Sequence, residues 1–167
     1  IAATVLILLG IGSVMIYLND RGALSRKTIV TTTENQKNLQ VTLPDGSNIF
    51  LNRNTRLSYR ENFGKHGRNV ALSGEAFFEI THDESNPFII DAGKARIKVL
   101  GTSFNVITKN ADSAVEVFVK TGQVMVSDNE GTKNLVLDPG DIGKMDSKIS
   151  EKSVNSNPNY LSWTTGV

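Results

Sequence analysis

Two glutamates in "LSGEAFFEIT", residues 72–81, are the side chains of this sequence that most invite a catalytic interpretation. Glu75 and Glu79 follow Gly74 in an otherwise apolar run. Paired carboxylates act as acid and base in glycoside hydrolysis when they lie about 5 to 9.5 Å apart. If residues 75–80 form a strand, about 3.3 Å per residue places the two backbones roughly 13 Å apart. This separation argues against a catalytic pair.

The alternation of a strand assigns these side chains to two faces. Glu75, Phe77 and Glu79 share one face, and the apolar residues between them share the other face, which belongs to the core. We therefore interpret both glutamates as part of a solvated outer face, with Glu75 beside the turn amides near Gly74.

The remaining candidates for chemistry are two histidines and two serines. His66 in "GKHGR" and His82 in "THDESNP" lie in polar turns, and the consecutive ligands of "HDE" diverge, whereas calcium loops gather oxygens at alternating positions. Ser73 and Ser103 lie near glycines but in no G-x-S-x-G elbow, and no phosphate-binding glycine loop is present. We predict no catalytic residue, no metal site and no cofactor, so the sequence does not indicate an enzyme.

Composition excludes other classes. The 167 residues carry 18 basic and 17 acidic side chains, a net charge of +1, and no cysteine. A nucleic-acid binder would have a strong positive field, so nucleic acid is not an expected partner. Length and hydrophobic content fit one globular domain with a small appendage.

The first eighteen residues, "IAATVLILLGIGSVMIYL", contain no charged side chain. As a helix they would reach roughly 27 Å, close to the ~30 Å apolar core of a bilayer. We predict a transmembrane helix over residues 1–18, whose beginning is truncated, and a juxtamembrane linker over residues 19–38. A signal peptide and a buried core helix are the alternatives.

From about residue 28 onward the hydrophobic period is two. Ile97 and Val99 alternate with basic residues, and "VEVFVK" places Val115, Val117 and Val119 on one face. This pattern predicts an all-β domain over residues 39–153, built from short, mostly antiparallel strands. Residues 154–167, polar and interrupted by a proline, are expected to link to a further domain.

A glycine recurs between apolar strands at spacings of 28, 27, 21 and 18 residues. The recurrence predicts stacked strand pairs, arranged as a twisted β-roll or solenoid-like stack, or else as a sandwich. The glycines expected in the turns are Gly46, Gly74, Gly101, Gly122 and Gly140.

Several blocks together resemble the FecR family of membrane-anchored anti-sigma factors. They are "LPDGSNIFLNRNTRLSYRENF", "RNVALSGEAFFEIT", "PFIIDAGKARIKVLGTSFNV", "LDPGD" and the final W-T-T-G, in the order that the family shows. The family motif positions are Pro44, Asp45, Gly46, Gly74, Glu75, Phe78, Glu79, Gly101, Thr102, Phe104, Asn105, Trp163 and Gly166.

The resemblance implies a signalling role without catalysis. A cytoplasmic domain, expected before residue 1, would hold an extracytoplasmic-function (ECF) sigma factor. A single span would cross the inner membrane, and the β domain would lie in the periplasm. There it would receive a signal from the N-terminal signalling domain of an outer-membrane TonB-dependent transporter. Transmission would occur either by a partner strand pairing with an exposed sheet edge or by altered access to residues 19–38.

Two other functions fit an all-β chain of this kind. A carbohydrate-binding module would need aromatic side chains lining one face, and Tyr59, Phe77, Phe118 and Trp163 are scattered in the sequence. A passive spacer, which lifts another domain off the membrane, is the third alternative.

Overall fold

The computed structural model describes residues 2–20, 25–108, 114–157 and 159–165. In these described ranges a single α-helix precedes thirteen strands, and a short 3-10 helix follows the last strand. The elements are α1 (Ala2–Asp20), β1 (Lys27–Thr31), β2 (Leu39–Thr42), β3 (Asn48–Leu51), β4 (Arg56–Arg60), β5 (Arg68–Glu79), β6 (Phe88–Asp91), β7 (Ala95–Val99), β8 (Ser103–Thr108), β9 (Val115–Thr121), β10 (Val124–Asp128), β11 (Asn134–Leu137), β12 (Asp141–Met145), β13 (Ser150–Val154) and η1 (Ser162–Thr165). The prediction of an all-β domain after one helix is confirmed.

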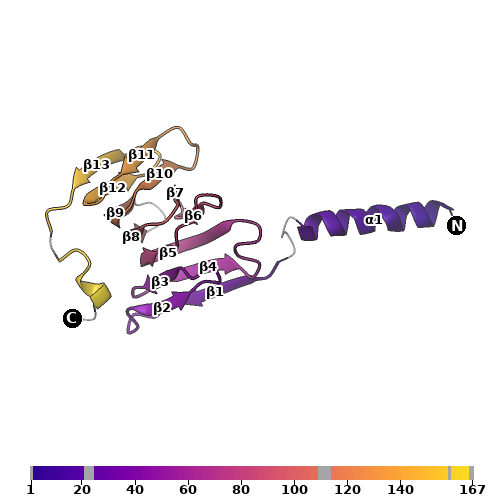
Figure 1. The fold of residues 1–167 in the computed structure, drawn as a ribbon, viewed down its shortest axis with the longest axis horizontal. Coiled ribbons are helices and arrows are strands. Elements are labelled where there is room, and N and C mark those ends of the chain that lie inside the picture. The colour runs from indigo at the N-terminus through magenta and orange to yellow at the C-terminus, as the bar shows by residue number, and fades with distance from the viewer. Residues whose placement is uncertain (1, 21–24, 109–113, 158, 166–167) are drawn as a thin grey trace.

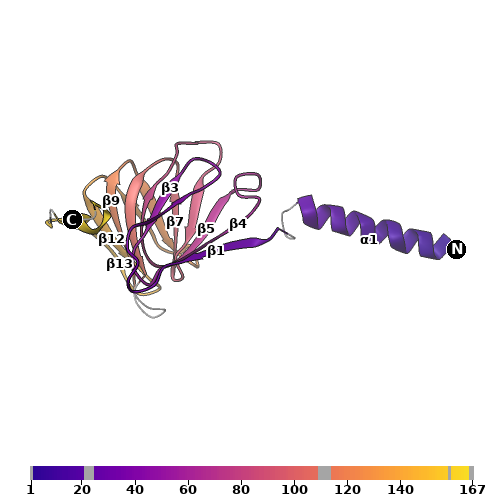
Figure 2. The same cartoon turned by 90° about the horizontal axis from the view of Figure 1, so that it is seen from below.

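The helix α1 extends away from the strands in both views (Figures 1 and 2). Its described side chains from Val5 to Tyr17 are largely exposed. Within the part of the chain that the structure describes, no helix has both the length and the apolarity needed to cross a membrane. The span predicted over residues 1–18 is therefore not confirmed.

The strands form two facing layers that share one long strand. In layer A the order is β1-β4-β5-β6-β7-β10-β11, and in layer B it is β2-β3-β5-β8-β9-β12-β13. The first half of β5 pairs with β4 and β6, and its second half pairs with β3 and β8. Because β11 also lies against β12 and β13, the layers nearly close into a flattened barrel.

Hairpins are added to the two layers in turn. The β6–β7 hairpin joins layer A, β8–β9 joins layer B, β10–β11 joins layer A and β12–β13 joins layer B. Figure 1 shows the resulting stack, which runs from β1 and β2 at one end to β11 and β13 at the other. The β5–β6 pair is parallel, and every other described pair is antiparallel, as the sequence predicts.

The core lies between the layers and is formed by the predicted inward residues. Ile97 and Val99 of layer A and the three valines of β9 are each at most 2% exposed. Phe78 and Phe104 stack with ring centroids 5.2 Å apart at 11°. Burial of this apolar surface makes the main favourable contribution to the free energy of folding.

Two segments predicted as linkers make contacts with the strands. Residues 27–31, predicted as linker, form β1 and pair with β4. Their burial pattern alternates between exposed and half-buried side chains, and none is fully buried. Residues 159–165, which lie in the segment predicted as a linker to a further domain, fold back against the outer face of layer B, as described below.

Candidate functional site

Gly74 lies inside β5, at the point where this strand passes from layer A to layer B. Its φ of +112° is in the region that favours glycine. A Cβ at this position would lie 2.5 Å from the Thr55 hydroxyl oxygen and 2.7 Å from the Thr55 Cα. Because Thr55 also hydrogen-bonds the Glu75 amide and carbonyl, it fixes the chain at the crossing.

The two glutamates of the sequence motif point outward from layer B, with different partners. The Glu75 carboxylate accepts hydrogen bonds from the side-chain amides of Asn52 at 2.7 Å and of Asn105 at 3.0 Å, not from turn amides. Glu79 is exposed and lies opposite Asn48. The side chain between them, Phe77, is buried although it faces outward.

Phe77 is only 3% exposed because other side chains of layer B cover it. The Phe50 ring lies 6.3 Å away, and the Lys120 ammonium lies 5.5 Å from the Phe77 ring centroid. The alternation of β5 correctly places Phe77 on the outer face, but it does not show that this face is covered.

Residues 159–165, which we name the C-terminal strap, also cover the outer face of layer B. The Tyr160 hydroxyl donates to Glu116 at 2.5 Å, and its ring lies 4.9 Å from that of Phe118. Burial, followed by the hydrogen bond to Glu116, raises the pKa of Tyr160 far above its usual value. At the far end of the strap, Asn38 donates to the Thr164 carbonyl at 3.0 Å.

The "LPDGS" motif is held by a buried arginine. Gly46 closes the turn with φ of +83°, and Asp45 accepts hydrogen bonds from the Ser47 amide and hydroxyl. Arg68, 2% exposed, pairs with Asp45 at 3.2 Å and donates to the carbonyls of Thr81, Asp83, Asn86 and Leu100. This network joins three loops that lie far apart in the sequence.

The "LGTSFN" motif packs against the same loops. A Cβ on Gly101 would lie 2.6 Å from the His82 Cα, and one on Gly122 would lie 2.6 Å from Cγ2 of Thr102. Thr102 is buried, and its carbonyl accepts a hydrogen bond from the Ile80 amide. These glycines allow the β8–β9 end to approach the loop that holds Asp83.

The remaining predicted positions that the structure describes lie in the core, in turns or in the strap. Phe104 is in the core, Pro44 and Gly140 lie in turns, and Trp163 lies in η1 of the strap. Gly166 falls outside the described residues.

The "HDE" residues do not converge on a cation. The Asp83 carboxylate accepts from the Ser85 hydroxyl and from the Ser85 and Asn86 amides, and the Ser85 hydroxyl is the main cause that lowers the pKa of Asp83. His82 faces Glu84 at 3.5 Å. In the described ranges, no group of three or more His, Cys, Asp or Glu side chains could hold a metal ion.

The two outer faces carry opposite charge. By strand register and exposure, layer A presents five basic side chains and one acidic side chain, which are Lys27, Arg56, Arg60, Arg96, Lys98 and Asp91. Layer B presents four acidic and two basic side chains, which are Glu75, Glu79, Glu116, Glu151, Lys120 and Lys144. The net charge of +1 conceals this division.

Sequence reasoning missed Arg68, Asn52, Glu116 and Tyr160. Arg68 is the first residue of β5. The alternation of that strand assigns Arg68 to the inner face, and this position indicates a buried side chain. The other three make contacts across strands or from the strap, and their spacing in the sequence gives no sign of those contacts.

The fold is an all-β domain whose two outer faces carry opposite charge. A sequence model of the FecR protein family matches residues 28–125, and the chain belongs to that family.

Solved structures of similar sequence share this fold. Two crystal structures of a candidate anti-sigma factor from Parabacteroides distasonis, at 2.50 Å and 1.65 Å resolution, are each 33% identical in sequence, with TM-scores of 0.75 and 0.74. They cover 84% and 83% of this chain. The chain spans 66% and 65% of the length of those proteins. No curated protein sequence matches it.

Proposed function

We propose that this chain carries the signal-receiving β domain of an anti-sigma factor, and that the domain acts by binding other proteins. The observation that carries the proposal is the FecR match over residues 28–125, together with the 33% identity to a candidate anti-sigma factor. The charged outer faces support it, because charge complementarity gives an interface specificity.

The partners and the location in this proposal follow from the family resemblance. The β domain lies in the periplasm and meets the signalling domain of a TonB-dependent transporter. A cytoplasmic portion of the full protein holds an ECF sigma factor, and the protein is attached to the inner membrane. Binding shifts the anti-sigma factor between a state that retains the sigma factor and one that releases it.

The experiment replaces the β domain in the full protein. In cells with a reporter gene driven by the cognate sigma factor, residues 27–154, which include β1, are exchanged for an unrelated β domain of similar length. We expect the reporter to stop responding to the inducing substrate, while the native protein restores the response. An unchanged response would show that the domain is a passive spacer.

The location is tested separately. Alkaline phosphatase, which is active only outside the cytoplasm, is fused after residue 157 of the full protein, and membrane and soluble fractions are assayed. We expect phosphatase activity in the membrane fraction. Activity of a cytoplasmic reporter fused at the same point would contradict the periplasmic placement.

Contacts within the chain disfavour the carbohydrate-binding alternative. Of the four aromatic residues considered for it, Phe77 is buried beneath Phe50 and Lys120, and Phe118 is packed against Tyr160. A sugar-binding platform needs aromatic faces that are open to the ligand.

A further inference from the structure

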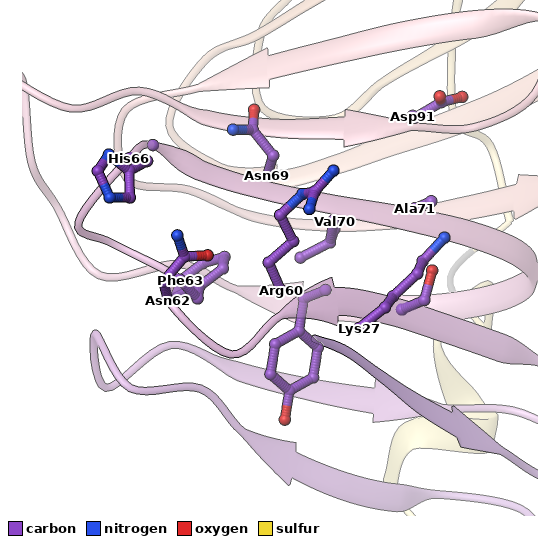
Figure 3. A pocket seen from close by; sticks show the side chains of 12 residues that line it. Lys27, Arg60, Asn62, Phe63, His66, Asn69, Val70, Ala71 and Asp91 are labelled. Carbon is purple, nitrogen blue, oxygen red and sulfur yellow. The ribbon is translucent and has the colours of Figure 1, made fainter. Parts of the chain in front are cut away.

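Two hollows with contrasting linings open beside the strands of layer A. One lies between β1, β4 and the start of β5, and many of its lining side chains are polar or charged, as Lys27, Asn62, His66 and Asp91 in Figure 3 show. The other encloses about 450 Å³ beside the turn that joins β7 to β8, and its lining is mostly apolar. This volume is in the range of ligand pockets, roughly 300 to 1,000 Å³. We name it the Leu100 groove, and its lining includes His82, Lys98, Leu100, Thr102, Met125 and Val136.

The Leu100 groove crosses three neighbouring strands at the end of layer A farthest from β1 (Figure 1). The register places Met125 of β10 directly opposite Lys98 of β7 on one side and Val136 of β11 on the other. Met125 and Val136 are each 44% exposed, and Leu100, in the turn after β7, is 39% exposed. The outward positions of a solvated antiparallel sheet are normally polar. Exposed apolar side chains that gather on such a face therefore indicate a surface that another molecule covers.

The turn that closes one end of the groove is held in place before any ligand binds. The Leu100 carbonyl accepts hydrogen bonds from the Asp83 amide at 2.8 Å and from the buried Arg68 guanidinium at 3.4 Å. A surface that is already fixed lowers the ordering cost of binding. The Thr102 side chain is 5% exposed, and its hydroxyl has no hydrogen-bond partner among the described residues. Because a buried hydroxyl without a partner costs free energy, a polar group of a ligand at this turn would gain by pairing with it.

The charge beside the groove is positive. Lys98 and His82 are the titratable side chains of the lining, and none of the described residues that line it is acidic. His82 already faces Glu84 at 3.5 Å, whereas Lys98 is exposed and forms no ion pair with the described residues. Arg96 lies two residues before Lys98 on the same outer face. An anionic group next to the apolar part of a ligand would therefore gain a charge-assisted hydrogen bond from Lys98.

We propose that the Leu100 groove binds an apolar side chain of an acidic peptide segment from a partner protein. The apolar side chain packs between Leu100, Met125 and Val136, and a neighbouring carboxylate of the segment pairs with Lys98. The flexible thioether of Met125 adapts its shape to the side chain that enters.

The exposure of the groove favours a protein segment over a free acyl chain. Its three apolar side chains each keep about two-fifths of their surface exposed, so the groove is open to solvent along its length. An acyl chain lying in it would stay partly in contact with water. A partner protein would cover both the entering side chain and the apolar surface around it.

Binding at the Leu100 groove rests on the proposed function only in taking the ligand to be a segment of a protein. Its test needs the purified chain and synthetic peptides, without a membrane, a transporter or a sigma factor. A failure here would leave the reporter experiment unaffected, and a failed reporter experiment would leave peptide binding to the groove measurable.

The test follows the amide NMR signals of the isotope-labelled 167-residue chain during titration with three seven-residue peptides. The leucine peptide alternates glutamate with serine around a central leucine. The alanine peptide has alanine in place of that leucine, and the glutamine peptide has glutamine in place of every glutamate.

We expect the leucine peptide to bind at least about tenfold more tightly than the alanine peptide, because a larger apolar side chain gains more from leaving water. It should bind at least about threefold more tightly than the glutamine peptide at low salt, and this difference should shrink at high salt. The shifted signals should be those of residues 98–102 and 122–125. Equal affinity of the leucine peptide and either of the others, or shifts confined to other parts of the chain, would overturn the proposal.

A pair of serine substitutions tests the apolar contact without changing the charge of the face. Met125→Ser removes the side chain at the middle of the groove. The matched control Ile29→Ser removes an apolar side chain of similar exposure, 46%, from β1 of the same layer, outside the groove. We expect Met125→Ser to weaken binding of the leucine peptide at least about fivefold and Ile29→Ser to change it less than about twofold. Equal losses in the two variants would overturn the proposal.

A pair of glutamine substitutions tests the charged contact. Lys98→Gln should weaken binding of the leucine peptide about threefold or more and leave binding of the glutamine peptide within about twofold. The control Lys27→Gln removes the same charge from the same face outside the groove and should change neither by more than about twofold. Equal losses in the two variants would show a general attraction and overturn the proposal. All four substituted residues are exposed strand positions, so melting curves should show the variants folded.

Decanoate, which joins an apolar chain to a carboxylate, is titrated in parallel. We expect it to bind at least about tenfold more weakly than the leucine peptide. Binding of decanoate at the groove amides, without binding of the leucine peptide, would overturn the proposal in favour of a free amphiphile.

Discussion

At the residue scale, the polar groups with most influence on this fold are buried and already paired. Arg68 is the clearest example, because its guanidinium joins one carboxylate and four carbonyls from three loops. Removing one partner of a buried ion pair destabilises a protein strongly, because the other charge stays buried without compensation. The intact pair, by contrast, adds little stability compared with apolar side chains of similar volume. The pair therefore fixes the positions of these loops more than it adds net stability.

Replacing Asp45 by asparagine tests this network. The Asp45→Asn variant removes the carboxylate that pairs with the buried Arg68 charge, and we expect the free energy of unfolding to fall by on the order of 2 to 3 kcal/mol. Urea denaturation measures it. The control Glu84→Gln removes a carboxylate from an exposed pair with His82 and should stay within about 0.5 kcal/mol. Equal effects in the two variants would contradict the structural role of the buried pair.

Gly74 combines an unusual backbone angle with a lack of space. Gly74→Ala must adopt strained φ and displace Thr55, so we expect a loss of about 3 kcal/mol. Gly64 also has positive φ, +88°, but open space around it, so Gly64→Ala isolates the backbone contribution and should cost about 1 kcal/mol. Thermal melts of both variants measure the difference, and equal melting temperatures would show that the contact with Thr55 is readily relieved.

At the element scale, aspartates tie the turns of the hairpins. The Thr132 hydroxyl is the main cause that lowers the pKa of Asp128, and the amides of Ile149 and Lys148 lower the pKa of Asp146. In the unfolded chain these carboxyls titrate near pH ~3.9. Their contribution to stability is therefore complete above that pH and is lost as the pH falls through the lower folded-state values.

We expect the melting temperature to fall steeply from about pH 4 downward. The Asp128→Asn variant lacks the carboxylate, so it lacks this contribution at every pH. Its melting temperature should therefore be lower than that of the native chain at pH 6 and should decline less between pH 4 and pH 2. Differential scanning calorimetry across this range measures both. A decline as steep as that of the native chain would show that Asp128 contributes little to the turn.

The C-terminal strap contacts layer B through the side chain of Tyr160. Tyr160→Phe keeps the ring contact with Phe118 but removes the hydrogen bond to Glu116, a loss of about 1 to 2 kcal/mol in strap attachment. We expect hydrogen exchange over residues 159–165 to accelerate roughly fivefold or more, with little change in the β-strand amides. Uniform acceleration over all strands would show instead that the strap is part of the core.

At the scale of the whole molecule, β5 makes the two layers one cooperative unit. Both layers bury their inner residues in one core and pair with the same strand. We expect one calorimetric transition with equal calorimetric and van't Hoff enthalpies. Two separated transitions would show that the layers unfold independently.

The sequence predicts part of this arrangement for definite physical reasons. Period-two alternation identifies the inward valines of β9 and the inward pair of β7, because one face of each strand must be buried. It does not reveal that Gly74 is the middle of a strand, since a glycine between two apolar runs has the same local pattern in a turn. Nor does it reveal β1, whose residues are half-buried at best.

The candidate surfaces were less predictable than the strands. Glu75 and Glu79 were correctly placed outward by alternation, but the partners of Glu75 come from β8 and from the loop after β3. The division of charge between the two faces depends on which strands are neighbours, and this order follows from the alternate addition of hairpins, not from sequence order.

That alternate addition has a consequence for how the domain could change its length. Strands β6–β9 and β10–β13 are two copies of one structural step, each placing a hairpin on either layer with the same strand directions. Each step leaves one unpaired strand edge in each layer, and the hairpins of the following step pair with these two edges. A gene duplication or deletion of one whole step would therefore leave a chain that can still close its core, so members of such a lineage could differ in height while keeping the same cross-section.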